Sequence, residues 1–179
     1  MLLDGRIYLN YVGRMATIAE ELDQVDRAIL DLLQANARIS NADIARKIGM
    51  APSAILDRLR KLEARGVIRG YEARLDPHAL GLGLVAFVFV KTEERLGSMT
   101  TGELLARIPE VQEVHHVAGE DCYLAKVRVE STEALGRLLR DRFGAIPSVT
   151  NTRTTIVLNT AKDPPPFPLH GPYRDPPHA

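Results

Sequence analysis

Ser40–Gly66 has the sequence SNADIARKIGMAPSAILDRLRKLEARG, and this stretch decides how the first part of the chain folds. Ser40 is a residue type that caps helices, and Asp43 stands three positions later, as in a capping box. Gly49 ends the short helix that follows, because glycine accepts the left-handed backbone found after many helices. Pro52 suits the first turn of a longer helix. We therefore predict two helices joined by a turn of three residues.

A further helix precedes this pair, since apolar residues recur there at helical spacing and Asp23 stands at its start. Packing among the apolar faces leaves the opposite face of the third helix free to enter a DNA major groove. A strand over Val67–Leu75 completes a predicted winged helix-turn-helix domain. The apolar positions are Leu22, Val25, Ile29, Leu32 and Leu33, then Ile44, Ala45 and Ile48, then Ile55, Leu59 and Leu62.

The free face of the third helix carries the residue types that bind DNA. An arginine can read a guanine edge with two hydrogen bonds, while Lys61 and Arg38 suit phosphates. Asp57 would repel phosphates unless it accepts from a cytosine amino group or pairs with Lys61 one turn away. A small helical bundle with a solvated basic face is the alternative. The predicted DNA-binding residues are Arg38, Ser53, Ala54, Asp57, Arg58 and Lys61.

The net charge of zero hides an uneven distribution. Asp23–Gly70 holds nine basic and six acidic residues, whereas Tyr71–Thr160 holds ten basic and twelve acidic ones. A basic segment followed by an acidic one suggests two domains with different tasks. We place the DNA-binding domain and its linker at residues 22–82 and a second domain at residues 83–160.

The second half alternates strand-like and helix-like segments in the order βαββαβ. This order is typical of a ferredoxin-like antiparallel sheet with both helices on one face, so the fold class is α+β. The predicted strands are Leu84–Lys91, Val111–Ala118, Cys122–Val129 and Val149–Asn159, and the predicted helices are Ser98–Ile108 and Ser131–Phe143.

The first of these strands is apolar at every position from Leu84 to Val90. A sheet with one solvated face should instead alternate apolar and polar residues. Something must therefore cover the second face, and we hypothesise that the same face of another copy does so in a homodimer.

Asp26–Gly70 resembles the DNA-binding domain of the Lrp/AsnC, or feast/famine, transcription regulators. The second half resembles their ligand-sensing domain, notably in LDPHALGLGLVAFVFV, IPEVQEVHHVAGEDCYLAKVRV and TRTTIVLNTAK. The resemblance covers about residues 22–162. It implies dimers whose sensing sheets pack together, assembly into higher oligomers, and an amino acid or related effector that changes DNA affinity.

The resemblance also implies an effector site between neighbouring dimers, at the turn that contains a glycine and acidic residues. Backbone N–H groups of such a turn can hold a carboxylate, and an acidic side chain can hold an ammonium group. Many members have aspartate where Cys122 stands, so the ammonium partner here is Glu120 or Asp121. Serine commonly opens the recognition helix where Ala51 stands, which leaves Ser53 to replace that contact. The implied effector residues are Gly119, Glu120, Asp121, Cys122, Tyr123, Thr152 and Thr154, although for either threonine alone an ordinary strand residue is the better interpretation.

No pattern in the sequence indicates a metal or cofactor site. His115 and His116 are adjacent on a strand, so they face opposite sides and cannot share a metal. Cys122 is the single cysteine, which excludes an internal disulfide and fits a reducing cytoplasm. The longest apolar run, Leu80–Val90, is too short for a membrane span.

Both ends of the chain lie outside the two predicted domains. Residues 1–21 form an arm without the features of a secretory signal, and Met15 is an alternative start of translation. Residues 161–179 hold seven of the eleven prolines, so we expect an extended, flexible tail.

We therefore expect a cytoplasmic, oligomeric transcription regulator that binds double-stranded DNA and a small effector, an amino acid, and that is not an enzyme. One alternative is a tetrapyrrole decarboxylase of related architecture, in which His115 could act. The other is an architectural DNA-binding protein with little sequence preference, which the zero net charge fits poorly.

Overall fold

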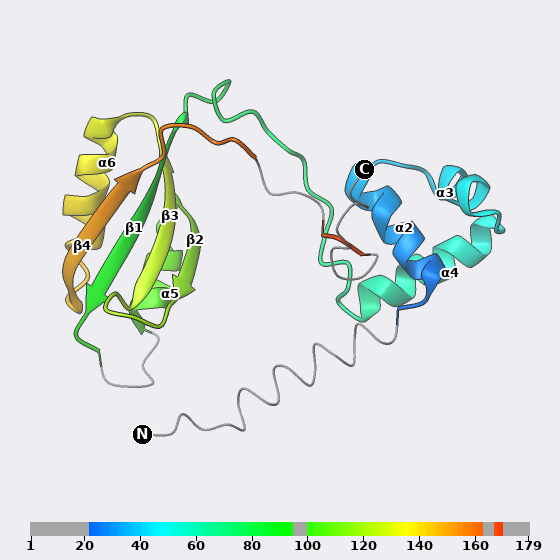
Figure 1. Cartoon of the computed structure of the whole chain (residues 1–179), viewed down its shortest axis with the longest axis horizontal. Coiled ribbons are helices and arrows are strands. Elements are labelled where there is room, and N and C mark those ends of the chain that lie inside the picture. Colours follow the sequence, from blue (N-terminus) through cyan, green and yellow to red (C-terminus); the bar gives the residue numbers. More distant parts are fainter. Residues whose placement is uncertain (1–21, 95–99, 163–166, 170–179) are drawn as a thin grey trace, which may run out of the picture. The chain divides into compact units, whose positions relative to one another are not determined.

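The computed structural model describes residues 22–94, 100–162 and 167–169. Its contacts divide the chain into two compact units, one from Met1–Ala73 with Pro164–Ala179 and one from Arg74–Asp163. We call them the helical domain and the sheet domain (Figure 1). The predicted arm, residues 1–21, and most of the predicted tail lie outside the described residues.

The helical domain contains α2 (Gln24–Ala35), α3 (Asn41–Ile48) and α4 (Pro52–Ala64), which confirms the predicted helices. Asp23 caps α2, since its Oδ1 accepts the Asp26 backbone N–H at 2.7 Å. All three helices contribute to one apolar core, whose buried members are Ile29, Ile44, Ala45, Ile55, Leu59 and Leu62. The apolar spacing in the sequence therefore marks the inward faces correctly.

The predicted strand over Val67–Leu75 is wrong, because the structure has no strand in this segment. A strand needs a neighbour that accepts and donates its backbone hydrogen bonds. The described residues provide no such partner here, and most of the segment is exposed, with Leu75 70% exposed. The β-forming residues of the segment are thus not enough to make a wing within one chain.

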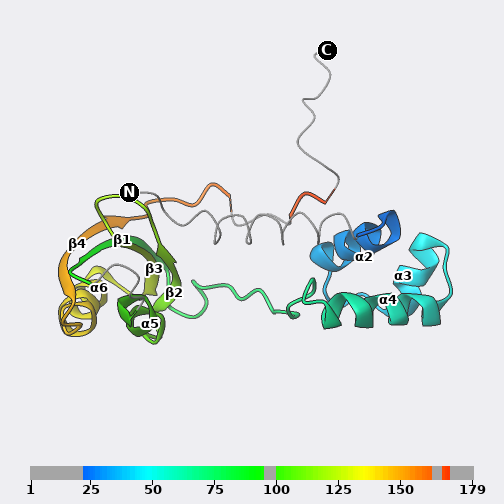
Figure 2. The ribbon, with the colours of Figure 1, turned by 90° about the horizontal axis from the view of Figure 1, so that it is seen from below.

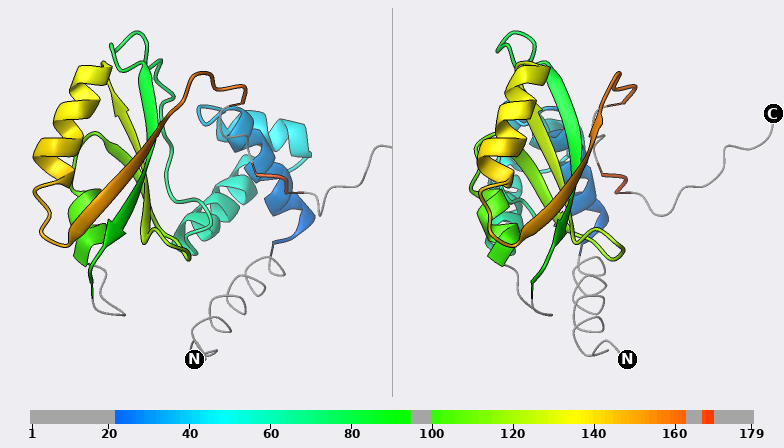
Figure 3. Two further views of the ribbon diagram at one scale, coloured as in Figure 1. Left: turned by 60° about the vertical axis from the view of Figure 1, so that its left-hand side comes forward. Right: turned by 90° about the vertical axis from the view of Figure 1, so that its left-hand side faces the viewer.

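The sheet domain has the predicted βαββαβ order and the strand order β2-β3-β1-β4, with every neighbouring pair antiparallel. Both views in Figure 3 show α5 and α6 on one side of this sheet. The fold is therefore the predicted α+β, ferredoxin-like arrangement. The elements are β1 (Leu84–Thr92), α5 (Thr100–Ala106), β2 (Val111–His116), β3 (Tyr123–Val129), α6 (Thr132–Leu138), a π-helical turn η1 (Leu139–Phe143) and β4 (Val149–Ile156).

The central strand β1 has two apolar faces. Ala86, Val88 and Val90 are fully buried beneath the helices. The alternate residues point to the other side of the sheet, where they are less covered. We call this side the open face and define it by Val85, Phe87, Phe89 and Leu124, surrounded by Glu113, His115, Lys126, Arg128 and Arg153.

Part of the predicted flexible tail contacts α2. The Gln34 side-chain amide accepts the Phe167 backbone N–H at 2.6 Å and donates to the Phe167 carbonyl at 3.2 Å. Arg27 Nη1 donates to the Leu169 carbonyl at 2.6 Å. Three hydrogen bonds between α2 side chains and the tail backbone thus place Phe167–Leu169 against the helical domain rather than with the sheet domain that precedes it.

No helix in the described parts of the chain combines the length and apolar character needed to cross a bilayer.

Two helical glycines of the sheet domain should respond oppositely to alanine. A Cβ on Gly102 would lie 2.7 Å from Cε1 of Tyr123, whose ring is buried, so Gly102→Ala should lower the free energy of unfolding by about 1–3 kcal/mol. A Cβ on Gly136 meets nothing within 4 Å, so Gly136→Ala should raise it by about 0.5–1 kcal/mol. Urea unfolding of both full-length variants measures this, and equal effects would contradict the described packing.

Candidate DNA interface and effector loop

The turn between α3 and α4 is held by backbone hydrogen bonds. Gly49 takes a left-handed φ of +79°, and the N–H groups of Gly49 and Met50 both donate to the Ala45 carbonyl, at 2.8 and 3.0 Å. Ala51 follows as the N-cap of α4 and makes no side-chain cap, as the sequence predicts. Pro52 then begins the helix. A tight turn with paired backbone N–H groups thus fixes where α4 starts.

The start of α3, unlike that of α4, has a side-chain cap. Ser40 Oγ accepts the Asp43 backbone N–H at 3.1 Å and donates to Asp43 Oδ2 at 2.7 Å. This hydroxyl, followed by the nearby Arg46 guanidinium, lowers the pKa of Asp43 below its ordinary value. The carboxylate therefore stays charged at the positive end of α3, where a negative charge is favoured.

The outer side of α4 is exposed. In Figures 1 and 2, α2 and α3 lie on the same side of α4, so neither helix covers the opposite side. Ser53, Asp57 and Lys61 are exposed there, as predicted, while Ala54 is half-buried at the edge. The helix therefore presents a polar face of the kind that enters a major groove.

Arg58 lies beside Ala54, Asp57 and Lys61, as predicted, but its guanidinium is engaged within the domain. Its Nη1 donates to Asp23 Oδ2 and Asp26 Oδ1, both at 2.7 Å. The two carboxylates raise the pKa of Arg58, and the Asp26 backbone N–H, followed by Arg58, lowers the pKa of Asp23. Arg58 thus joins α4 to the first turn of α2, and a guanine contact would have to displace these two carboxylates.

Arg60 is the DNA-facing candidate that the sequence analysis missed. It is exposed, and it shares a helix face with Ser53 and Asp57, at spacings of seven and three residues. Within the described residues, Arg60, Lys61 and Arg38 form no ion pair, so each guanidinium or ammonium group is available to phosphates. Helical spacing from Asp57 was the signal that could have identified Arg60.

The loop between β2 and β3 has its backbone tied at its base. The Val117 N–H donates to the Cys122 carbonyl at 3.0 Å, and the Cys122 N–H donates to the Val90 carbonyl at 3.0 Å. Gly119 has a φ of +151°, a conformation that favours glycine. Glu120 is exposed at the tip.

Asp121 already has a partner. Its Oδ2 accepts from Arg153 Nη2 at 2.9 Å, and the Arg153 guanidinium lies 4.0 Å from the centre of the Phe89 ring. Arg153 was not predictable as a site residue, because nothing in the spacing of residues 121 and 153 links them before the strand register is known.

Tyr123 and Cys122 lie deeper than the loop tip. The buried Tyr123 hydroxyl donates to Glu94 Oε2 at 3.1 Å, and Glu94 Oε1 accepts the Thr101 N–H at 2.8 Å. Burial, reinforced by Glu94, raises the pKa of Tyr123. Cys122 is half-buried with its Sγ 3.9 Å from the Thr92 carbonyl. Both residues therefore serve the packing of this end of the sheet.

The two predicted threonines of β4 lie on the helix-covered face. Thr152 pairs with Val90 and Thr154 with Val88, and both β1 residues are fully buried there. Arg153, between them, points to the open face. Within one chain Tyr123 and the two threonines therefore share the helix-covered face, whereas Asp121 pairs with Arg153 on the open face.

The adjacent histidines follow the expected alternation. His115 pairs with Leu124 and His116 with Tyr123, on opposite faces. His115 Nε2 lies 3.3 Å from Glu113 Oε2, and the His116 ring centre lies 5.1 Å from that of Tyr123.

Two family models match the chain, and the boundary between the helical and sheet domains lies between the residues they match. Residues 22–69 match a winged helix-turn-helix DNA-binding domain, and residues 85–167 match the Lrp/AsnC ligand binding domain.

Curated relatives match along most of the chain. The leucine-responsive regulatory proteins of Klebsiella pneumoniae and Escherichia coli K12 are each 36% identical over 145 residues, which is 80% of this chain and 88% of each relative.

Solved structures agree with both matches. A Neisseria meningitidis transcriptional regulator in complex with L-Met aligns with a TM-score of 0.78 at 29% identity, over 83% of this chain and 97% of that one. A feast or famine regulatory protein from M. tuberculosis, complexed with L-methionine, aligns with a TM-score of 0.73 at 38% identity, over 79% and 95%. By sequence and by structure, then, the chain belongs to the Lrp/AsnC family of DNA-binding transcription regulators that respond to small-molecule effectors.

Proposed function

We propose that the chain is a cytoplasmic transcription regulator that reads specific DNA sites with α4 and responds to an amino acid at the loop 119–123. The observation that carries the proposal is the exposed polar side of α4, presented by the fixed turn Gly49–Ala51 in a domain matched to DNA-binding proteins. The L-methionine complexes of two relatives support an amino acid as the effector class.

Ser53, Ala54, Asp57, Arg60 and Lys61 form the proposed DNA-reading surface. Arg60 offers the bidentate donor that suits a guanine edge, and the Ala54 methyl group suits contact with a thymine methyl group. Lys61 and Arg38 bind phosphates and orient the helix. Arg58 acts by holding α4 on α2, through its two carboxylate partners.

At the effector loop, backbone N–H groups of residues 119–121 bind the carboxylate of the amino acid. We assign its ammonium group to Glu120, because Asp121 already accepts a hydrogen bond from Arg153. Thr152 and Thr154 support β4 from the helix-covered face rather than contact the effector.

The open face forms a homodimer in this proposal. Phe87, Phe89 and Leu124 are only half-buried in the single chain, and a second copy of the same face would cover them. Dimers then assemble further through their effector loops. An effector bound between dimers changes this assembly, and the changed assembly favours a different DNA geometry.

We do not assign catalysis. His115, the residue an enzyme of related architecture could use, pairs with Glu113 on the open face, which is the proposed dimer surface.

Arg58→Gln and Arg60→Gln make the same charge change on one helix but should have different effects. Arg58→Gln leaves the nearly buried Asp26 carboxylate without its cation, so the free energy of unfolding should fall by roughly 1–3 kcal/mol. Arg60→Gln should leave stability unchanged and weaken binding to the specific DNA site by about 1–3 kcal/mol, because the bidentate contact with guanine is lost. Urea unfolding and fluorescence anisotropy measure the two effects, and reversed effects would refute both assignments.

Replacement of the loop carboxylates tests the effector site. Glu120→Gln should weaken L-methionine binding at least tenfold in calorimetry, because the ammonium group loses its charged partner. Asp121→Asn, the matched change at the residue already paired with Arg153, should weaken it less than threefold. A larger loss in Asp121→Asn than in Glu120→Gln would show that the ammonium site is assigned to the wrong residue.

A charge on the open face should prevent dimer formation. Phe87→Asp places a carboxylate at the centre of the proposed interface, so the dissociation constant should rise at least a hundredfold in sedimentation velocity. Leu158→Asp, at a position 97% exposed in the same domain, is the control and should remain dimeric. Circular dichroism establishes that both variants are folded. Wild-type protein that sediments as a monomer at micromolar concentration would contradict the proposed interface.

A further inference from the structure

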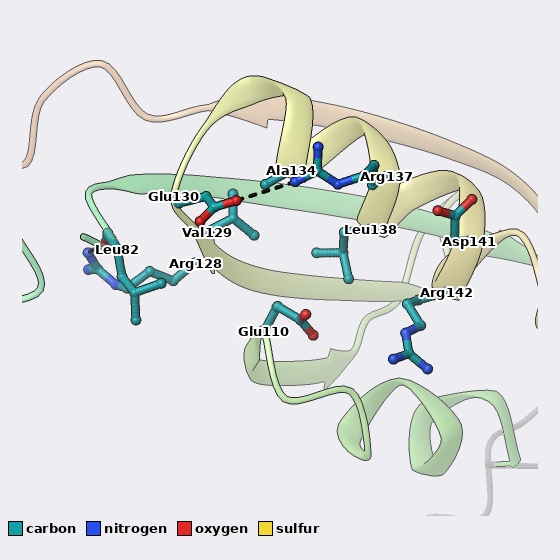
Figure 4. A pocket seen from close by; sticks show the side chains of 10 residues that line it. All are labelled: Leu82, Glu110, Arg128, Val129, Glu130, Ala134, Arg137, Leu138, Asp141 and Arg142. Atoms are coloured by element: carbon teal, nitrogen blue, oxygen red, sulfur yellow. Dashed lines mark hydrogen bonds and ion pairs between the residues drawn. The ribbon is translucent and has the colours of Figure 1, made fainter. Parts of the chain in front are cut away.

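The sheet domain contains a cavity of about 370 Å³ between α6 with η1 on one side and the ends of β2 and β3 on the other (Figure 4). Its apolar wall is made by Val129 and Leu138, which are buried, and Ala134, which is half-buried. Leu82 closes the end nearest the linker from the helical domain. The volume lies within the range of cavities that bind small molecules.

Six charged residues surround this cavity, and most of them have partners. Arg137 Nη2 donates to Glu130 Oε1 at 3.3 Å, and Asp141 accepts from Arg140 Nε at 2.9 Å. Arg128 Nε donates to Gln112 at 3.3 Å and its Nη1 to the Leu82 carbonyl at 3.0 Å.

Glu110 and Arg142 are the exceptions. Glu110 Oε2 is buried, and within the described residues it accepts no hydrogen bond. Arg142 forms no ion pair within the same residues. Figure 4 shows the Glu110 carboxylate directed into the space below α6, and the Arg142 side chain descending from η1 beside that space. A buried carboxylate oxygen without a donor is unfavourable, and a donor brought by a ligand would relieve that cost.

We propose that this cavity is a second ligand site, which binds a small molecule with an ammonium group and a carboxylate. The ammonium group donates to Glu110, and the carboxylate accepts from Arg142 in the charge-assisted geometry that guanidinium groups favour. The apolar part of the ligand packs on Leu138, Val129 and Ala134.

This site is separate from the effector loop. Glu110 precedes the first residue of β2, whereas the loop follows the last, and the six residues of β2 span about 20 Å at the usual rise of a strand. The cavity is instead next to Leu82, where the linker enters the sheet domain. Arg128 donates a hydrogen bond to the Leu82 carbonyl there. A ligand here contacts the joint between the linker and the sheet domain, and not the proposed interface between dimers.

Methyl NMR of the full-length protein can observe both sites at once. L-methionine is the probe, with Val129 and Leu138 reporting on the cavity and Val117 on the loop. We expect all three methyl signals to move in the wild type. In Glu110→Gln, the L-methionine concentration that half-saturates the Val129 and Leu138 shifts should rise at least tenfold, while that for Val117 should not change. The unfolding midpoint should not fall, since the replaced oxygen has no partner. Glu103→Gln, an exposed acid on α5, is the charge-matched control and should bind as the wild type does.

N-acetyl-L-methionine lacks the ammonium group and should not move Val129 or Leu138. A response of Val117 alone would overturn the second site and leave the proposed effector loop intact. An unaltered response of Val129 and Leu138 in Glu110→Gln, or an equal response to the acetylated probe, would also overturn it.

Discussion

The structure depends on β1, a central strand that is apolar on both faces. Ala86, Val88 and Val90 are buried within the chain, because α5 and α6 cover them. Phe87 and Phe89 are only half-buried, and the Arg153 guanidinium lies over the Phe89 ring. A sheet of this kind needs a second apolar surface. The same strand lies between β3, which continues from the effector loop, and β4, which carries Arg153. Any assembly built on β1 therefore also sets where the effector loops lie.

Two arginines of α4 differ in their surroundings. Arg58 ties α4 to α2 through Asp23 and Asp26, while Arg60, two residues later, is exposed and without an ion pair in the described part of the chain. One turn of a helix thus holds a residue that fixes the helix and a residue that is free to bind. The position of the proposed DNA-reading face then depends on a structural ion pair as well as on the apolar core.

Most of the fold follows from the sequence, because capping residues and apolar periodicity are local signals. Ser40, Gly49 and Pro52 mark α3 and α4, and the strand alternation gives the two faces of the sheet. Interactions between distant residues were not predictable in this way. Arg58 meets carboxylates 32 and 35 residues away, and Asp121 meets Arg153, 32 residues away. The strand predicted at Val67–Leu75 is absent because a strand also needs a partner from elsewhere in the chain, and the β-propensity of its own residues does not supply one. The docking of Phe167–Leu169 on α2 likewise depends on Gln34 and Arg27, far away in sequence.

The most direct test of an effector-gated DNA-binding regulator is fluorescence anisotropy with labelled DNA from the gene's own upstream region and a scrambled control. The salt concentration is fixed near physiological, because phosphate contacts make affinity depend strongly on salt. The account predicts tighter binding to the upstream DNA and a change in that affinity when an amino-acid mixture is added. Equal affinity for both DNAs, with or without the mixture, would contradict it and indicate an architectural role.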